Sequence, residues 1–213
     1  MEVVNSFTLI PGTMANCYDV SYNGKRFLID AGTKGSGKKI VEYYNALKTK
    51  PDIVLITHYH PDHIGGLSLV KETFNPVIYV PDGEIDVVKG QKKMTPASSL
   101  MSRFVATVMK SKPVKDVRPV SELKYDGIKV IKSNGHTPDS TSYLFTSLKA
   151  LFVGDAAMKN GEKVTVNRGF TLDYNKALSS IQTLSEEKEA TVFPGHGKPF
   201  RFDGGNHEAI REE

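Results

Sequence analysis

Three histidines and one aspartate fall within six consecutive positions. His58 and His60 follow the apolar run 53–56, and Asp62 and His63 come soon after them. Alternate side chains of an extended segment point to the same side, so His58 and His60 can face a common point. Asp62 and His63 fall at the start of the helix expected next, where they can serve a second metal ion. Because transition-metal ions bind imidazole and carboxylate donors, this segment predicts a metal centre.

Four further residues of the same chemical types share one location, the C-terminal end of an apolar strand. They are His136 after the run 128–131, Asp155 after 151–153, His196 after 191–193 and Asp30 after 26–29. Strand ends hold loop-borne side chains on a rigid scaffold, so these residues are expected to converge on one edge. One such residue alone would usually be a turn residue. Five of the six histidines occupy these positions, however, and only His207 lies elsewhere.

The cysteine content limits the ligand chemistry. Cys17 is the only cysteine, which excludes an intrachain disulfide and a thiolate-based zinc site. We expect Cys17 to be a small buried apolar residue, because nothing near it in the sequence marks an activating base. Imidazole and carboxylate donors without thiolate suit zinc, iron or manganese, and zinc is the first expectation.

Short apolar, β-branched runs recur along the chain and predict strands. They cover residues 7–10, 26–29, 53–56, 77–80, 128–131, 151–153 and 191–193. Helices are expected at 37–48 and at 174–184, with Asp173 as the N-cap of the second. Hairpin-like strands early in the chain, with Asn23-Gly24 at a turn, precede mixed strands and helices. This order favours an α/β fold with two sheets inside and helices outside.

The composition indicates one globular domain over residues 1–213, with 39% hydrophobic and 24% charged residues and no repeat or long linker. Residues at about 83–121 interrupt the alternation of strands and helices and are expected to form a helical insertion. Thr95-Pro96 suits the N-cap and first helical position of its helix. Its apolar residues at helical spacing are Leu100, Met101, Phe104, Val105, Val108 and Met109. This stripe favours a core or dimer contact, and a lid over the substrate is the alternative.

The positive charge of the chain is local. The net charge is +4, and residues 82–119 contain eight basic and four acidic residues. The basic residues flank an apolar helix without the interleaved aromatic rings that favour base stacking, so no nucleic-acid partner is expected. No run approaches the roughly 18 to 20 apolar residues that span a bilayer, and the first residues lack a signal-like pattern. We expect a cytoplasmic protein with a small-molecule substrate and no membrane partner, and a homodimer stays open.

The candidate residues stand in recurring short motifs. An HxHxDH motif is present as His58-x-His60-x-Asp62-His63. The later motifs are Gly135-His136-Thr137-Pro138, Gly154-Asp155 and Pro194-Gly195-His196-Gly197, and an early strand ends in Leu28-Ile29-Asp30-Ala31-Gly32. Together these motifs resemble those of the metallo-β-lactamase-fold superfamily, from about residue 7 to residue 199. The resemblance implies a four-layer αββα sandwich.

The resemblance also implies the ligand sets. His58, His60 and His136 would hold one metal ion, Asp62, His63 and His196 would hold the other, and Asp155 would bridge the two. Asp30 matches a family aspartate that supports the ligands without binding metal. Two Zn²⁺ per chain are therefore expected, with Fe or Mn as alternatives.

The activity implied by the resemblance is that of a dinuclear metallohydrolase. A metal-bridging hydroxide would cleave an ester, thioester or lactone of a small molecule, and Asp62 would move a proton. Thiolesterases of the glyoxalase II type carry a basic helical C-terminal extension that this sequence lacks, so that branch is not expected. Two alternatives stay open: a ribonuclease Z-like phosphodiesterase, and a persulfide dioxygenase-like enzyme with one iron on His58, His136 and Asp155.

Overall fold

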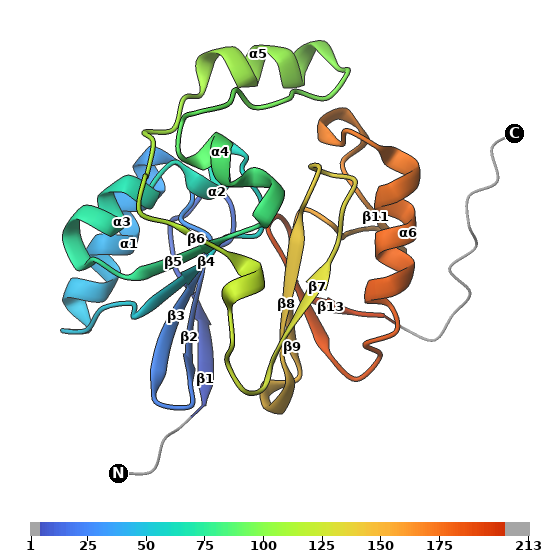
Figure 1. Ribbon diagram of the computed structural model, residues 1–213. Helices are drawn as coiled ribbons and strands as arrows, with labels where there is room; N and C mark the ends of the chain where they lie inside the picture. The colour runs from blue at the N-terminus through green and yellow to red at the C-terminus, as the bar shows by residue number, and fades with distance from the viewer. Residues whose placement is uncertain (1–4, 203–213) are drawn as a thin grey trace, which may run out of the picture.

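Two sheets packed face to face between outer helices form the four layers of the molecule (Figure 1). The computed structural model describes residues 5–202, so His207 and both ends of the expected domain 1–213 lie outside the described residues. The layers run helix, sheet, sheet, helix, with α1 and α3 on one side and α6 on the other (Figure 1). The predicted α/β class and αββα sandwich are confirmed.

The first sheet has six strands in the order β1-β2-β3-β4-β5-β6. Their bounds are β1 Ser6–Leu9, β2 Tyr18–Tyr22, β3 Lys25–Ile29, β4 Ile53–Leu55, β5 Val77–Val80 and β6 Arg118–Pro119. The first three strands pair antiparallel, and β3 to β6 pair parallel. Parallel pairing requires crossover connections, which place α1 (Lys34–Ala46) and α3 (Leu67–Phe74) outside this sheet.

The second sheet has five strands in the order β13-β12-β9-β8-β7. Their bounds are β7 Ile128–Lys132, β8 Thr141–Phe145, β9 Ala150–Gly154, β12 Thr191–Pro194 and β13 Phe200–Arg201. A separate hairpin is formed by β10 (Met158–Asn160) and β11 (Lys163–Thr165). Helix α6 (Tyr174–Leu184) covers the outer face, and its N-cap is Asp173, whose side chain accepts from the Lys176 amide.

The remaining helices are short. They are η1 Asp82–Glu84, η2 Val120–Glu122, η3 Thr146–Leu148, η4 Arg168–Phe170, α2 Pro61–Ile64, α4 Ile85–Val88 and α5 Leu100–Val108. Helix α5 lies outermost, above the upper ends of both sheets (Figure 1). Within residues 5–202 no helix combines the length and apolarity needed to cross a bilayer.

Two predicted helix starts are wrong. The first helix begins at Lys34 rather than 37, because the Thr33 hydroxyl accepts a hydrogen bond from the Ser36 amide and caps the helix earlier. In the insertion, Thr95 does not cap a helix. The chain stays irregular until Ser99, whose hydroxyl accepts from the Ser102 amide and becomes the N-cap of α5.

The core between the sheets is largely aromatic. Alternate residues of β2 point into it, namely Tyr18, Val20 and Tyr22, as the two-residue period of a strand requires. The intervening Asp19 points toward α1, where it accepts a hydrogen bond from the Tyr44 hydroxyl at 3.1 Å. Phe152 of β9 lies at the centre of the core, fully buried, with the ring of Tyr18 from the other sheet 5.0 Å away. Aromatic contacts of this kind hold the two sheets at a fixed distance.

We expect Phe152→Ala to lower the free energy of unfolding by about 3–5 kcal/mol, because it removes a fully buried ring and leaves a cavity between the sheets. Chemical denaturation measures the loss. Phe104→Ala is the matched control: that ring is 64% exposed, so the change should stay within about 0.5 kcal/mol. Equal effects of the two substitutions would contradict this account of the core.

Candidate metal centre and the pocket above it

All seven candidate ligands meet at one edge of the molecule, where strands of both sheets end. His58 and His60 follow β4, while Asp62 and His63 lie in α2. His136 follows β7, Asp155 follows β9 and His196 follows β12. Strands β9 and β12 are parallel neighbours, and the Gly195 amide donates to the Gly154 carbonyl at 2.7 Å. This pairing places Asp155 and His196 side by side.

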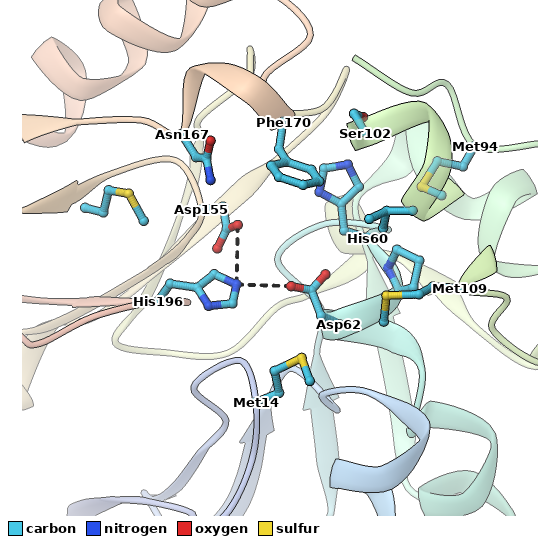
Figure 2. Close-up of a pocket in the computed structure, with 13 residues that line it drawn as sticks. Met14, His60, Asp62, Met94, Ser102, Met109, Asp155, Asn167, Phe170 and His196 are labelled. Atoms are coloured by element: carbon cyan, nitrogen blue, oxygen red, sulfur yellow. Dashed lines mark hydrogen bonds and ion pairs between the residues drawn. The ribbon is translucent and has the colours of Figure 1, made fainter. Parts of the chain in front are cut away.

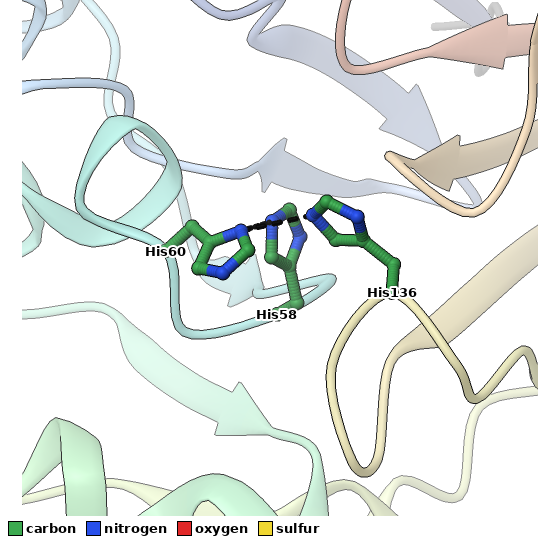
Figure 3. A group of neighbouring side chains, drawn as sticks. All are labelled: His58, His60 and His136. Atoms are coloured by element: carbon green, nitrogen blue, oxygen red, sulfur yellow. Dashed lines mark hydrogen bonds between the residues drawn. The ribbon is translucent and has the colours of Figure 1, made fainter. Parts of the chain in front are cut away.

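Three histidines form the first half of the site (Figure 3). His60 Nδ1 lies 3.1 Å from His58 Nε2 and 2.9 Å from His136 Nε2. The other ring nitrogen of His58 contacts the Thr57 hydroxyl at 3.0 Å, and that of His136 contacts Thr171 at 3.3 Å. The outer nitrogens are thus held by hydroxyl groups, while the inner nitrogens point to a shared position.

The histidines of this half-site are held in the neutral form. Burial, and then the neighbouring imidazoles, lower the pKa of His58 well below its usual value. Burial also lowers the pKa of His60 to about 3 and the pKa of His136 below its usual value. A metal ion binds neutral imidazole, so these rings require no proton release at neutral pH.

The second half of the site contains Asp62, His63 and His196. His196 Nε2 donates to Asp62 Oδ2 at 3.0 Å (Figure 2), and this hydrogen bond raises the pKa of His196. Burial alone would lower the pKa of His63, but the carboxylates of Asp30 and Asp155 outweigh it and raise that pKa well above its usual value. This half-site therefore carries more negative charge than the three-histidine half-site.

Asp155 faces both half-sites. Its Oδ1 lies 3.3 Å from His63 Nε2, and its Oδ2 lies 3.5 Å from His136 Nε2 and 3.7 Å from His196 Nε2. Burial would raise the pKa of this carboxyl, but the surrounding imidazoles outweigh burial and lower it. One ionised carboxylate can therefore contact ions in both half-sites.

Two polar atoms test whether this donor set fits metal ions. His63 Nε2 and Asp155 Oδ1 are buried and lack a hydrogen-bond partner within residues 5–202. A buried polar atom without a partner costs free energy, and a metal ion between such atoms removes that cost. The candidate ligand atoms lie within 4.8 Å of one another in each half-site and also in a third set that joins them, so each set can contact a common ion. The third set is His58, His63 and Asp155. The residues therefore fit a metal centre with two adjacent positions.

Asp30 lies behind the ligands rather than among them. Its Oδ1 accepts from the Thr57 amide at 2.8 Å, and its Oδ2 accepts from the Thr57 hydroxyl and lies 2.7 Å from His63 Nδ1. The residue is buried and adopts a φ of 57°, in the left-handed region that non-glycine residues rarely occupy. This backbone turns the carboxylate at the end of β3 toward α2. His63 is thereby oriented with Nε2 facing the site.

Glycine at position 195 is required by close packing. A Cβ atom there would lie 2.5 Å from Asp155 Oδ1 and 2.6 Å from His63 Cε1. Gly154 adopts a φ of 52°, and a Cβ there would overlap the Thr57 hydroxyl. The glycines that precede Asp155 and His196 therefore let the two strand ends approach the ligands.

A cavity of about 280 Å³ opens above the metal centre (Figure 2). His60, Asp62, Asp155 and His196 form its floor. Its walls are mainly apolar: Met14, Pro61, Met94, Val105, Met109, Met158 and Phe170. Ser102 and Asn167 add polar groups, and no lysine or arginine lines the cavity within the described part of the chain. The cavity thus combines a charged floor with apolar walls.

Several of these wall residues could not be found from motifs. Met14 lies in the loop after β1, whereas Met158, Asn167 and Phe170 lie in or after the β10–β11 hairpin. None belongs to a periodic or recurring pattern in the sequence. Tyr18 and Tyr59 do not line the cavity, and their hydroxyl groups donate hydrogen bonds to the backbone carbonyls of Pro194 and Thr95.

Glu84 is a further residue near the site that the motifs did not mark. Its Oε1 accepts hydrogen bonds from the Thr137 hydroxyl and, at 3.2 Å, from the Asp139 amide. Both partners lie in the loop that carries His136. Burial raises the pKa of the Glu84 carboxyl to about 7, because the two hydrogen bonds offset only part of the lost hydration. Glu84 fastens the start of the insertion to the His136 loop.

Comparison with known proteins gives one family. A model described as the metallo-beta-lactamase superfamily matches residues 10–196. A probable metallo-hydrolase, MJ0888 of Methanocaldococcus jannaschii, is 28% identical over 82% of this chain and 84% of its own length. Hydroxyacylglutathione hydrolase of Haemophilus ducreyi is 31% identical over 67% of this chain. The match covers only 50% of that enzyme's own length. The structure of TTHA1623 in a di-iron-bound form superposes with a TM-score of 0.73 at 23% identity, covering 92% of this chain and 93% of the other.

Asp30→Asn should weaken metal binding in the half-site of His63 by about 10–100-fold. The amide no longer favours a proton on His63 Nδ1, so a proton on Nε2 competes with the metal ion. Metal content after dialysis and a competition titration with a chromophoric chelator measure the loss. Asp19→Asn is the control, since it also removes a buried carboxylate, but one whose hydrogen-bond partners are two tyrosines of α1. Unchanged binding in Asp30→Asn would contradict this role.

Glu84 should give the unfolding free energy a measurable pH dependence. Its pKa is raised in the folded chain, so its stabilising contribution is complete below about pH 4.5 and is lost as the pH rises toward 7. Metal-free protein should therefore lose stability relative to Glu84→Gln across this window. Denaturation of both proteins at several pH values measures the difference.

The control for this titration is Glu162→Gln, which removes a carboxylate whose side chain is 96% exposed. Its unfolding free energy should run parallel to that of the parent. A Glu84→Gln curve that is also parallel would show that Glu84 does not titrate in this range.

Proposed function

Because this chain belongs to the metallo-β-lactamase superfamily, we propose that it is a dinuclear zinc-dependent hydrolase. Its proposed substrate is an ester, thioester or lactone of a small molecule with an uncharged, apolar acyl part. The observation that carries the substrate class is the cavity, whose apolar walls stand directly above the candidate metal ligands.

The proposed metal ligands form two sets, which correspond to the two half-sites. His58, His60 and His136 would hold one ion, Asp62, His63 and His196 the other, and Asp155 would contact both. When bound, two such ions would lower the pKa of a water molecule and would polarise the carbonyl oxygen of the substrate, on which negative charge develops during the reaction. Iron remains an alternative to zinc, since imidazole and carboxylate donors suit both.

Asp62 is the proposed proton-transfer residue. Its side chain is 27% exposed, borders the cavity and accepts the hydrogen bond from His196. Burial would raise its pKa, but His196 and His63 lower it to about 2, so the carboxylate is ionised at neutral pH. An ionised carboxylate at this position can take a proton from the attacking water and pass it to the leaving group.

The cavity walls select among the activities of the family. A phosphodiester backbone or a glutathione moiety carries several charges, and cationic side chains usually bind such groups. The described lining contains neither lysine nor arginine. Ser102 and Asn167 could each bind one polar group of a substrate, and the methionines and Phe170 could surround an acyl chain. These features favour acyl substrates over ribonuclease Z-like ones.

The set of ligands disfavours a mononuclear iron dioxygenase. That alternative uses His58, His136 and Asp155, and it requires nothing from the second half-site. In this chain Asp62, His63 and His196 also come together within one group, which offers three donors to a second ion. The relative from Haemophilus ducreyi is named a hydroxyacylglutathione hydrolase, which supports hydrolysis as the reaction class.

We expect protein purified without added metal to contain about two zinc ions per chain and to hydrolyse p-nitrophenyl esters, acyl thioesters or lactones. kcat/KM should rise with acyl chain length, because longer chains bury more apolar surface against the methionines. Asp62→Asn should lower kcat by about 10²–10⁴-fold. Elemental analysis and steady-state kinetics measure these quantities.

The controls separate the competing functions. Asp173→Asn removes an exposed carboxylate at the N-cap of α6 and should leave kcat unchanged. Bis-p-nitrophenyl phosphate tests phosphodiester cleavage, and oxygen uptake with glutathione persulfide tests the dioxygenase. A single iron with oxygen uptake, or activity confined to the phosphodiester, would sink the proposal.

A further inference from the structure

Helix α5 has two apolar faces, and only one of them is covered. Ser102, Val105 and Met109 line the cavity above the metal centre. The residues on an adjoining side of the helix are largely exposed: Leu100 by 83%, Met101 by 59%, Phe104 by 64% and Val108 by 60%. These are half of the large hydrophobic residues that are exposed in residues 5–202. An outward patch of this kind marks a contact surface.

The segment of sequence that contains this patch carries charge of one sign. Residues 87–115 contain seven basic residues and no acidic one, the basic ones being Lys89, Lys92, Lys93, Arg103, Lys110, Lys112 and Lys115. Lys112 pairs with Glu72 at 2.6 Å, and the other six form no ion pair with a described residue. The exposed apolar patch of α5 is therefore embedded in a segment of unpaired positive charge.

We propose that the α5 patch, together with the basic residues of the segment 87–115, docks on an anionic lipid surface. Apolar side chains on one helix face enter the boundary between headgroups and acyl chains, while lysine and arginine bind anionic headgroups. Such a helix lies on the membrane rather than across it, so the proposal needs no long apolar segment. It departs from the sequence-based expectation of no membrane partner.

The charges argue against a second copy of this chain as the occupant. Two α5 patches placed face to face would bring two clusters of unpaired cations together in a poorly hydrated contact. Nucleic acid would match the charge, but only one of the four exposed side chains, Phe104, has an aromatic ring on which a base could stack. An anionic bilayer satisfies both the charge and the aliphatic side chains.

The position of α5 connects the proposed membrane contact with the active site. The helix is the outermost element at the end of the molecule where the ligands converge (Figure 1). One face would rest on lipid, while the other lies over the cavity, and Ser99 joins the start of the helix to the Gly169 carbonyl near the cavity wall. An amphiphilic acyl substrate could pass from the bilayer around one short helix. This last step rests on the proposed function, whereas docking itself does not.

The absence of tryptophan from the chain permits a direct test. Phe104→Trp places a single indole in the patch, and its emission should shift to shorter wavelength with phosphatidylserine–phosphatidylcholine vesicles. Pure phosphatidylcholine vesicles should give a much smaller shift, and added salt should reverse the effect. Leu47→Trp is the matched control, because Leu47 is 50% exposed at the end of α1, outside the patch, and should give no shift.

A charge reversal tests the electrostatic part. Lys92→Glu with Lys93→Glu should weaken partition to the anionic vesicles by about tenfold or more, measured by co-sedimentation. Lys48→Glu with Lys50→Glu reverses two exposed charges beyond α1 and should leave partition nearly unchanged. Unchanged thermal unfolding of all variants shows that they fold.

The vesicles are made from ether-linked phospholipids, which contain no acyl ester, so docking can fail or succeed independently of the proposed hydrolysis. No sedimentation of the parent protein at low salt would overturn the proposal, as would equal partition to neutral and anionic vesicles. A blue shift that follows protein concentration without vesicles, together with a dimer in sedimentation velocity, would assign the patch to a second copy and would also overturn it.

Discussion

The buried carboxylate of Asp30 is the interaction on which the arrangement of the site depends. It joins the end of β3 to the Thr57 backbone after β4 and to His63 in α2. A carboxylate that accepts three hydrogen bonds in a buried location is satisfied and strongly oriented. Without it, the two parallel strands would still pair, but the segment from Thr57 to His63 would lose the hydrogen bonds that hold it against the end of β3. The unusual backbone at Asp30 is the cost of aiming this group inward.

The metal centre is also a site of conflicting requirements. Five imidazoles and two ligand carboxylates share a small volume, and two of their polar atoms lack hydrogen-bond partners within the described residues. Such a cluster opposes folding unless metal ions bind between the side chains. The aromatic core around Phe152 and the hydrogen bonds of Asp30 and Thr57 supply rigidity nearby. The candidate ligands therefore lie in a rigid part of the fold, which can keep these side chains together despite the free-energy cost.

The sequence predicted where the candidate ligands lie in the fold, because they follow short, strongly apolar strands. Every one of the seven predicted runs overlaps a strand, and the residues after them converge at one edge. Strand β8 and the short strands β6, β10, β11 and β13 were not predicted, and β2 was implied only by the turn expected at Asn23-Gly24. In β2, Asp19 interrupts the apolar pattern because its partners are tyrosines on α1, and in β8 small polar residues are buried with the aromatic ones. These choices depend on tertiary contacts that local pattern does not contain.

The cavity walls were less predictable for the same reason. Met14, Met158 and Phe170 come from separate loops, and only the folded chain brings them together. The helical insertion was expected from its apolar spacing, but spacing alone did not separate the face over the cavity from the exposed face. The side chains of α5 that face the cavity depend on where the helix begins. Ser99, rather than Thr95, fixes that start, because it is the N-cap.

The methionines of the cavity have a chemical consequence of their own. Four of the six methionines in the chain, Met14, Met94, Met109 and Met158, line one cavity, and Met14 is 69% exposed. Oxidation of a thioether to a sulfoxide turns a flexible apolar side chain into a polar one, and reductases reverse the change. An oxidising environment would therefore alter what the cavity accepts while leaving the histidines and aspartates below it intact. Substrate selection in this enzyme would thus be sensitive to redox conditions even though its proposed chemistry involves no electron transfer.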